Sequence, residues 1–330
     1  MDFAAASVSG TQANVKGTSI TQNLGQATTS VIRIGVVEDL GGGMRATAQY
    51  NFDPRVIATD NGALARDEMF IGLSGGFGNI RLGSPNSIGL TTFGVASPLG
   101  TGIGSGYGVT AGDYSFIRHN RSARYDSPTI NGFTASLLYA PGNDQAVAGS
   151  PAPAQLIGNA RQVTELGLRY AKGPLTIAYA NVAQAAQTNG ASAAVNIAKT
   201  STNILAASYT MGATTLSAGW NDGDALFNRT ATAGTALKSN GSRVAVSHTM
   251  GAITLIASVA NQKTDGVKED VTGLRADYAL SKRTVAYMGY ENWDNKNATT
   301  AAANAITLSA FPAVNKGDRK ITSIGLRHSF

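Results

Sequence analysis

Apolar and polar side chains alternate along much of this chain, and no other feature constrains its fold as strongly. Within 45–52 the even positions hold alanine, tyrosine or phenylalanine, and the odd positions hold arginine, threonine, glutamine or asparagine. The same alternation recurs in 161–170, 215–221 and 273–278. Successive side chains of a strand point to opposite faces, whereas a helix would repeat its faces every three to four residues. The pattern therefore predicts an all-β protein.

The apolar residues are spread along the chain rather than gathered into long runs. Hydrophobic residues make up 43% of the chain, but the mean hydropathy is −0.04. A membrane-spanning helix needs about 18 or more consecutive apolar residues, and runs such as 253–257 are far shorter. A membrane-spanning strand needs only about 10 residues, half of which face lipid. The sequence therefore excludes a helical membrane protein and permits a transmembrane β-barrel.

Short and long connections alternate between the predicted strands. Seven short connections rich in turn residues lie at 38–43, 75–78, 129–132, 171–174, 211–213, 250–252 and 280–282. Eight longer loops lie at about 12–29, 53–66, 85–117, 142–160, 185–200, 223–240, 264–268 and 295–317. Eight hairpins joined by seven turns require sixteen strands, and this arrangement is typical of an outer-membrane barrel. We expect one domain spanning 1–330.

The sequence lacks the residue patterns of disulfide-bonded, metal-binding, enzymatic and nucleic-acid-binding proteins. The chain has no cysteine, which excludes disulfides and thiolate metal sites, and its three histidines have no ligand spacing. No hydrolase or metalloprotease motif occurs, and the 26 lysines and arginines form no runs that would suggest nucleic-acid binding. We therefore expect no cofactor, metal or enzymatic activity. The chain opens Met1-Asp2-Phe3 without a signal peptide, as a mature form would.

Four segments carry a family resemblance. They are Val37–Ala46, which contains Glu-Asp-Leu-Gly-Gly-Gly, Phe70–Gly78, Asn120–Pro128 and the final Ile324–Phe330. These segments resemble the second-to-third-strand turn, the next turn, the sixth strand and the ending of trimeric porins from β-proteobacteria. The resemblance spans nearly the whole chain. It implies a general-diffusion porin, a 16-stranded antiparallel transmembrane β-barrel in the outer membrane of a Gram-negative bacterium, with homotrimeric assembly.

The resemblance also implies that the third loop, 85–117, folds into the barrel and constricts it. Glycines at 100, 102, 104, 106 and 108 suit a backbone lying against an inner wall. A phosphate-binding loop would need a preceding strand and a following helix in one βαβ unit, and that context is missing.

Alternation assigns a one-sided excess of arginine to the lumen. The predicted constriction consists of the four arginines nearest the third loop in chain order and the one acid on that loop. These residues are Arg33, Arg81, Arg118, Arg124 and Asp113. The other predicted wall residues are Arg45, Arg161, Glu165, Arg169, Arg275, Asp277 and Arg327. Low-dielectric walls focus the electric field of such positive charge, and this field attracts anions. We therefore expect small anionic or neutral solutes to pass. Glu165 and Asp277 are placed to pair with neighbouring arginines.

The last strand places Ile324, Leu326 and Phe330 on its outward face. In the family such an ending is read by the barrel-assembly machinery. The resemblance further implies contact with outer-membrane lipid and lipopolysaccharide, and a second loop that latches onto a neighbouring subunit.

The chain departs from the family in two places. An additional half-strand usually precedes the Asp2 region, and its absence suggests a trimmed N-terminus and leaves the pairing of the first and last strands open. A family arginine aligns near Asp67, so either Arg66, Asp67 or Glu68 faces the pore.

Two other functions fit parts of the sequence. A substrate-specific channel would share the fold but contain an ordered ligand site. An adhesin or passenger solenoid is suggested by the Ala, Gly, Thr and Asn content, and it would be soluble without detergent.

Overall fold

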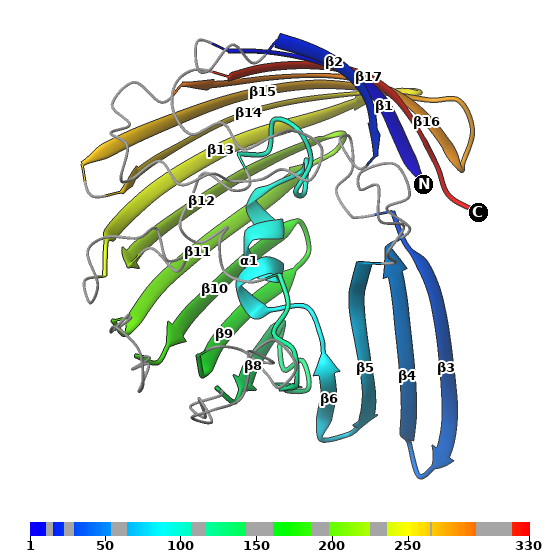
Figure 1. Cartoon of the computed structure of the whole chain (residues 1–330). Helices are drawn as coiled ribbons and strands as arrows, with labels where there is room; N and C mark the ends of the chain where they lie inside the picture. Colours follow the sequence, from blue (N-terminus) through cyan, green and yellow to red (C-terminus); the bar gives the residue numbers. More distant parts are fainter. Residues whose placement is uncertain are drawn as a thin grey trace, which may run out of the picture.

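One curved antiparallel sheet wraps around a short helix, α1 (Figure 1). The structure is a computed structural model of the 330-residue chain. It describes residues 1–10, 16–22, 30–53, 65–106, 117–142, 161–186, 198–224, 236–264, 266–294 and 319–330. Within these ranges it contains seventeen strands.

The strands are, in chain order, β1 Asp2–Gly10, β2 Lys16–Gln22, β3 Ile32–Gly41, β4 Met44–Asp53, β5 Ala65–Gly75, β6 Gly78–Ser84, β7 Ser122–Asp126, β8 Phe133–Ala140, β9 Val163–Lys172, β10 Leu175–Gln184, β11 Thr200–Met211, β12 Thr214–Asp224, β13 Lys238–Met250, β14 Ile253–Thr264, β15 Val267–Ala279, β16 Thr284–Asp294 and β17 Arg319–His328. Helix α1 spans Ile88–Ala96, between β6 and β7. Among the described residues, no helix has the length and hydropathy of a membrane-spanning helix.

Each strand from β3 to β17 pairs with the next one along the chain, and the pairing then continues from β17 to β1 and from β1 to β2. Asp2 lies opposite Arg327, and Gly10 lies opposite Arg319. The first and last strands are therefore paired along the whole of β1, which answers the question that the sequence left open. The predicted antiparallel β-barrel is confirmed.

The strand count differs from the prediction of sixteen by one. The seven predicted short turns join strands as expected, but the predicted loop at 12–29 contains β2, which folds back along β1 with Phe3 opposite Gln22. The free edge of β1 offers backbone donors and acceptors, and the β-branched residues of 16–22 suit a strand. The prediction was wrong here because this segment was assigned to a loop from its polar composition.

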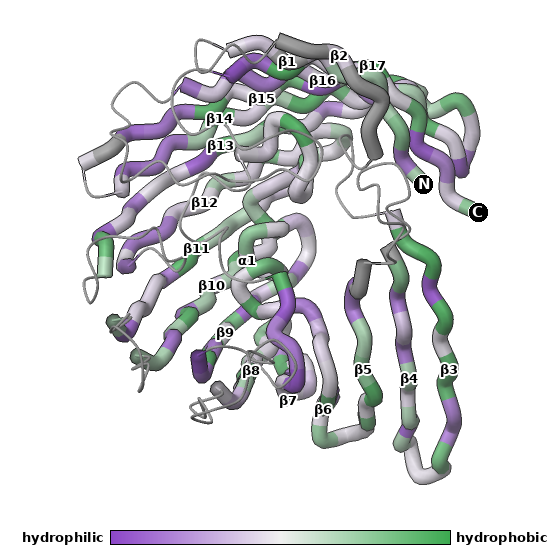
Figure 2. The backbone as a smooth tube through the Cα atoms, viewed as in Figure 1, coloured by the Kyte–Doolittle hydropathy of each residue, from purple (hydrophilic) through white to green (hydrophobic). Residues whose placement is uncertain are grey.

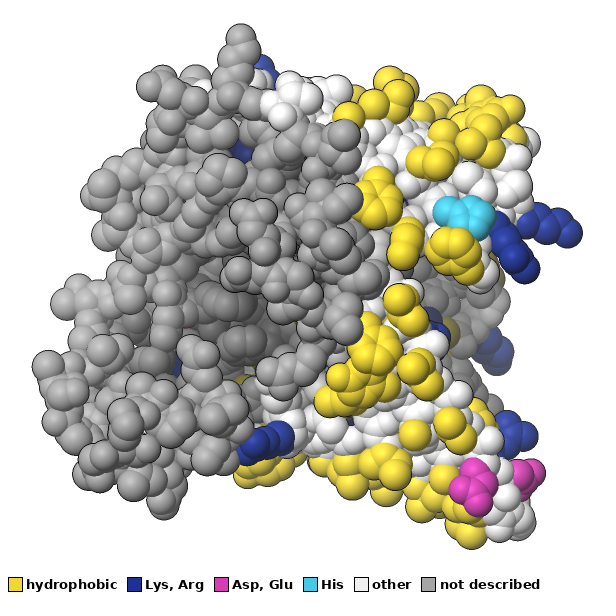
Figure 3. Space-filling model, turned by 45° about the vertical axis from the view of Figure 1, so that its right-hand side comes forward, with side chains coloured by type: hydrophobic (Ala, Val, Ile, Leu, Met, Phe, Trp, Pro, Cys, Tyr) yellow, Lys and Arg dark blue, Asp and Glu magenta, His cyan; other side chains and the backbone are white. Residues whose placement is uncertain are grey.

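The outward face of the sheet is apolar. Ile34, Val36 and Ile324 are 58%, 61% and 67% exposed, and they alternate with the small residues Gly35, Ser323 and Gly325 on the same strands. Figure 2 shows this alternation along the strands, and Figure 3 shows apolar side chains covering the described part of one outer face. A soluble protein would bury such a surface, whereas a membrane protein exposes it to lipid.

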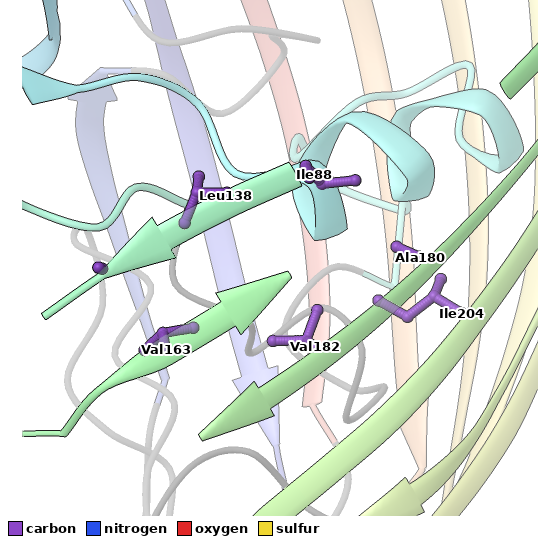
Figure 4. Packing of buried hydrophobic residues seen from close by; sticks show 7 residues of the cluster. Ile88, Leu138, Val163, Ala180, Val182 and Ile204 are labelled. Atoms are coloured by element: carbon purple, nitrogen blue, oxygen red, sulfur yellow. The ribbon is translucent and has the colours of Figure 1, made fainter. Parts of the chain in front are cut away.

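The main buried apolar cluster lies on the inner wall beneath α1. It consists of Ile88, Leu138, Ala140, Val163, Ala180, Val182 and Ile204 (Figure 4). Ser87 caps the helix, since its Oγ accepts from the Leu90 backbone N–H at 2.9 Å. The small interior core thus holds α1 against the barrel wall.

Candidate functional site: the charged wall around the inward helix

Residues 85–106, called the inward segment here, form the described part of the predicted constriction loop 85–117. Within this segment, α1 contacts the strands from β8 to β13 and lies inside the curve of the sheet (Figure 1). Residues 107–116 lie outside the described residues, and Asp113 is among them. The predicted acid of the constriction therefore has no described position.

Two of the predicted constriction arginines share a carboxylate that the sequence interpretation overlooked. Arg81 on β6 lies directly opposite Arg124 on β7, where like charges repel. Asp126 accepts from Arg124 Nη2 at 2.9 Å through Oδ1, and its Oδ2 pairs with Arg81. Arg124 is buried, and its Nη1 donates to the backbone oxygen of Asn86 at 2.7 Å. This cluster therefore fixes the start of the inward segment and compensates part of the arginine charge.

A second pair of acids faces inward from β5. Asp67 forms an ion pair with Arg118. Glu68 accepts from the backbone N–H of Asn86 at 3.1 Å. Both carboxylates therefore face the pore side, whereas the side chain of Arg66 lies outside the described residues.

A cavity of about 270 Å³ separates α1 from β3, β4 and β5. Arg33 and Arg118 line it together with Asp67, Glu68 and Phe93. The cavity lining alone holds two arginines and two carboxylates. Together with the adjoining cluster of Arg81, Arg124 and Asp126, it makes a group of four arginines and three carboxylates with one net positive charge. Among the described residues, Arg33 has only a neutral partner, because its Nε donates to Asn51 Oδ1 at 3.3 Å.

The predicted wall residues on β15 and β17 form a separate group. Asp277 accepts from Arg275 Nε at 2.5 Å, and Arg327 lies 3.9 Å from the same carboxylate. The Arg275 guanidinium also lies over the Tyr287 ring, 4.9 Å from its centroid. This group is distant in the sheet order from the cluster around Arg81, so the structure does not bring all predicted arginines to one place.

The remaining predicted arginines differ in their surroundings. Arg161 is buried among neutral oxygens, including the backbone oxygens of Ala185 at 2.6 Å and Ala198. Burial lowers the pKa of the Arg161 guanidinium from its ordinary value. Arg45 and Arg169 are exposed. Arg161 thus tethers backbone near the long loops and does not contact α1.

Glu165 pairs with a histidine rather than with the predicted arginine. Its Oε1 lies 2.7 Å from His119 Nε2, and both side chains are fully buried. The sequence interpretation gave His119 no role, because a lone histidine carries no local signal. The contact joins β9 to the end of the third loop.

Three further inward residues were missed although their strands alternate clearly. Arg243 lies over the Phe93 ring of α1, 4.0 Å from its centroid, and donates to the Ser105 backbone oxygen at 3.0 Å. Arg319 Nη2 donates to Glu291 Oε1 at 2.7 Å. The alternation of side chains along β13, β16 and β17 was enough to predict that all three side chains face the lumen.

Comparison with known proteins also indicates an outer-membrane porin. A family model described as Gram-negative porin matches residues 1–298. Outer membrane porin protein 32 of Delftia acidovorans is 28% identical over 327 residues, which cover 93% of this chain and 87% of that protein. Major outer membrane protein P.IB of Neisseria gonorrhoeae is 33% identical over 147 residues, which cover 43% of this chain and 42% of that protein.

Solved structures have the same fold. An anion-selective porin from Comamonas acidovorans superposes with a TM-score of 0.79 at 22% identity, covering 100% of this chain and 97% of that one. The trimer form of OmpT from Vibrio cholerae gives a TM-score of 0.66 at 13% identity, covering 100% and 98%. The outer face is apolar, the inner wall is charged, helix α1 lies inside the barrel, and the family model matches nine-tenths of the chain. The chain therefore belongs to the Gram-negative porin family and is a β-barrel channel of the outer membrane.

Proposed function

We propose that this porin is a general-diffusion pore with a preference for small anions, and that the loop 85–117 is its constriction. The observation that carries the proposal is the cavity beside α1, where Arg33 faces a neutral amide while Arg118 faces a carboxylate. Because the guanidinium of Arg33 has no carboxylate partner among the described residues, the four arginines and three carboxylates of the cavity and the adjoining Asp126 cluster give the narrow region a net positive field. The walls have a low dielectric constant, which focuses that field on a passing ion.

The size of this effect is sufficient for selectivity. Two unit charges about 4 Å apart interact by about 4 kcal/mol at an effective dielectric constant near 20. Since about 1.4 kcal/mol corresponds to a factor of ten, even a partly screened charge at Arg33 biases permeation severalfold. The anion selectivity of the Comamonas acidovorans porin supports the same sign for this chain.

The proposal includes assembly as a homotrimer in contact with outer-membrane lipid and lipopolysaccharide. The trimer form of the Vibrio cholerae porin supports the trimer. The second loop, Asp53 to Ala65, is the proposed latch between subunits, and its side chains lie outside the described residues. The wide apolar outer face supports the lipid contact.

The ending of β17 is the proposed signal for the barrel-assembly machinery. Ile324, Leu326 and Phe330 are 67%, 48% and 87% exposed on the outer face. A partner that guides assembly can reach these side chains directly.

Swelling of liposomes that contain the purified porin tests the proposed pore. Neutral sugars should enter at rates that fall with size, and an anionic solute should enter faster than a cationic solute of matched size. A cation that enters faster would contradict the anion preference. Saturation with one solute, and exclusion of others of its size, would identify a substrate-specific channel instead.

A further inference from the structure

Two buried wall carboxylates hold the two ends of the inward segment through its backbone. Glu165 on β9 holds the beginning of α1, and Glu291 on β16 holds Gly104, eight residues beyond the end of the helix. Each glutamate has an inward-facing glycine two residues away on its own strand, Gly167 and Gly289. The same local device is thus used on opposite sides of the barrel interior.

The first contact uses free donors at a helix terminus. The first backbone N–H groups of a helix have no partner within the helix, and a carboxylate there also favours the helix dipole. Glu165 Oε2 accepts from the N–H groups of Ile88 at 2.5 Å and Gly89 at 3.0 Å. Its Oε1 contacts His119 Nε2 at 2.7 Å. Because Glu165 is fully buried, losing these partners would leave its charge uncompensated.

The wall is also shaped to let the segment approach closely. A Cβ at Gly167 would lie 2.5 Å from Ile88 Cγ2, and a Cβ at Gly219 on β12 would lie 2.8 Å from Ala96 Cβ. Real Cβ atoms do not approach other atoms this closely. Glycine in a strand marks such an approach of another segment, and here α1 has one glycine beneath each end.

The second contact holds the backbone of a single residue, Gly104, from three neighbouring strands. Ser258, Gly273 and Glu291 form one row across β14, β15 and β16. Glu291 Oε2 accepts from the Gly104 N–H at 2.8 Å, and Ser258 Oγ donates to the Gly104 backbone oxygen. A Cβ at Gly273 would overlap the Gly104 backbone, and Gly104 itself has a φ of +81°, which glycine tolerates.

We propose that Glu165 and Glu291 are positioning residues that fix how far the inward segment stands from the wall, and thereby set pore width and anion preference. The inference rests on the proposed function of 85–117 as the constriction. Neither glutamate needs to touch a solute, since each acts through the backbone of the segment. When the ends of the inward segment are released from the two glutamates, the segment can move. The charged cavity beside α1 then loses its fixed geometry.

Alanine and glutamine variants at both positions test the inference. Glu165→Ala and Glu291→Ala remove the acceptor oxygen, whereas Glu165→Gln and Glu291→Gln remove the charge and keep an acceptor. Single-channel conductance should rise and become noisier in the alanine variants, most of all in the double variant, and should stay near wild type in the glutamine variants. Asp270→Ala on the exposed outer face of β15 is the matched control. Heat-modifiable migration in SDS reports whether each variant is folded.

The direction of the selectivity change separates positioning from charge. If only the lost negative charge mattered, removing a wall carboxylate would raise the anion preference. Releasing the inward segment lowers the anion preference instead, so the reversal potential of the alanine variants should move toward zero. Hydrogen exchange in peptides covering 86–106 should be roughly tenfold faster, the effect of losing about 1.4 kcal/mol of local stability.

The inference is overturned if the folded double alanine variant keeps wild-type conductance, reversal potential and exchange. It is equally overturned if the glutamine variants behave like the alanine ones, since the charge and not the backbone contact would then matter. A cation-selective wild type would refute the proposed anion preference, whereas conductance and exchange would still test the two glutamates.

Discussion

Arg33 and Asn51 lie directly opposite each other on β3 and β4, and Arg33 Nε donates to Asn51 Oδ1 at 3.3 Å. The partner of this guanidinium is therefore a neutral amide. Arg81, Arg118 and Arg124 each contact a carboxylate instead. The positive charge of the narrow region consequently depends on Arg33 more than on its neighbours.

Replacing Arg33 should weaken anion preference directly. In Arg33→Gln the net charge of the four arginines and three carboxylates counted above falls from one to zero. Close unit charges interact by about 4 kcal/mol before screening, so after screening we expect the anion-to-cation permeability ratio to fall severalfold. Asn51→Asp should act in the same direction by compensating Arg33. Lys282→Gln, in the exposed turn between β15 and β16, is the control. Unchanged reversal potentials in both pore variants would show that Arg33 does not set the field.

Removing Asp126 should have the opposite effect on selectivity and also cost stability. Asp126→Asn leaves Arg81 and Arg124 without their shared carboxylate, so anion preference should rise. Losing one partner of a largely buried ion pair costs on the order of 2 kcal/mol or more, and unfolding in denaturant should occur at lower concentration. Asp222→Asn, on the exposed face of β12, should change neither. A less anion-selective Asp126→Asn would contradict this charge assignment.

Salt should reduce the selectivity if it is electrostatic. The screening length is about 10 Å at 0.1 M and about 3 Å at 1 M ionic strength. The permeability ratio obtained from reversal potentials should therefore approach that of free solution as KCl rises. A ratio that does not change with salt would point to selection by size.

Loss of the final residue should affect assembly more than conduction. Phe330 is 87% exposed, and its ring meets that of His328 edge-on at 4.7 Å between centroids. Deleting Phe330 should lower the amount of folded porin in outer membranes, while the channels that form conduct normally. Phe330→Tyr, which keeps an aromatic ring, should assemble well. Wild-type amounts of the deletion variant would refute the proposed signal.

The porin should be a trimer in mild detergent. Native mass measurement should give three times the 33.8 kDa of one chain, and deletion of residues from the second loop should weaken the trimer. A stable monomer at all protein concentrations would contradict the assignment.

The fold was largely predictable because alternation and turn composition are local signals. The turn at 41–43, three glycines with positive φ, was recognised from the residues themselves. The strand at 16–22 was not, since its pairing depends on the free edge of β1 and not on its own composition. Helix α1 was missed as well, because nine residues are too few for helical spacing to stand out.

The site was predictable only in part, because a sequence shows which arginines face inward but not what they contact. Asp126 follows Arg124 by two residues, so their shared face could have been read directly. Asp67 and Arg118 are 51 positions apart and meet only because β5 and the end of the third loop are neighbours in space. Long-range partners of this kind decide the net charge of the site.

The zero-current potential of the wild-type porin across a planar bilayer, measured at low ionic strength under a KCl gradient, reports directly whether chloride or potassium permeates better. An excess of chloride permeation drives the dilute side negative, and the net positive charge around Arg33 predicts this sign. A positive dilute side would show that potassium permeates better than chloride, and would contradict the account of this pore as anion-preferring.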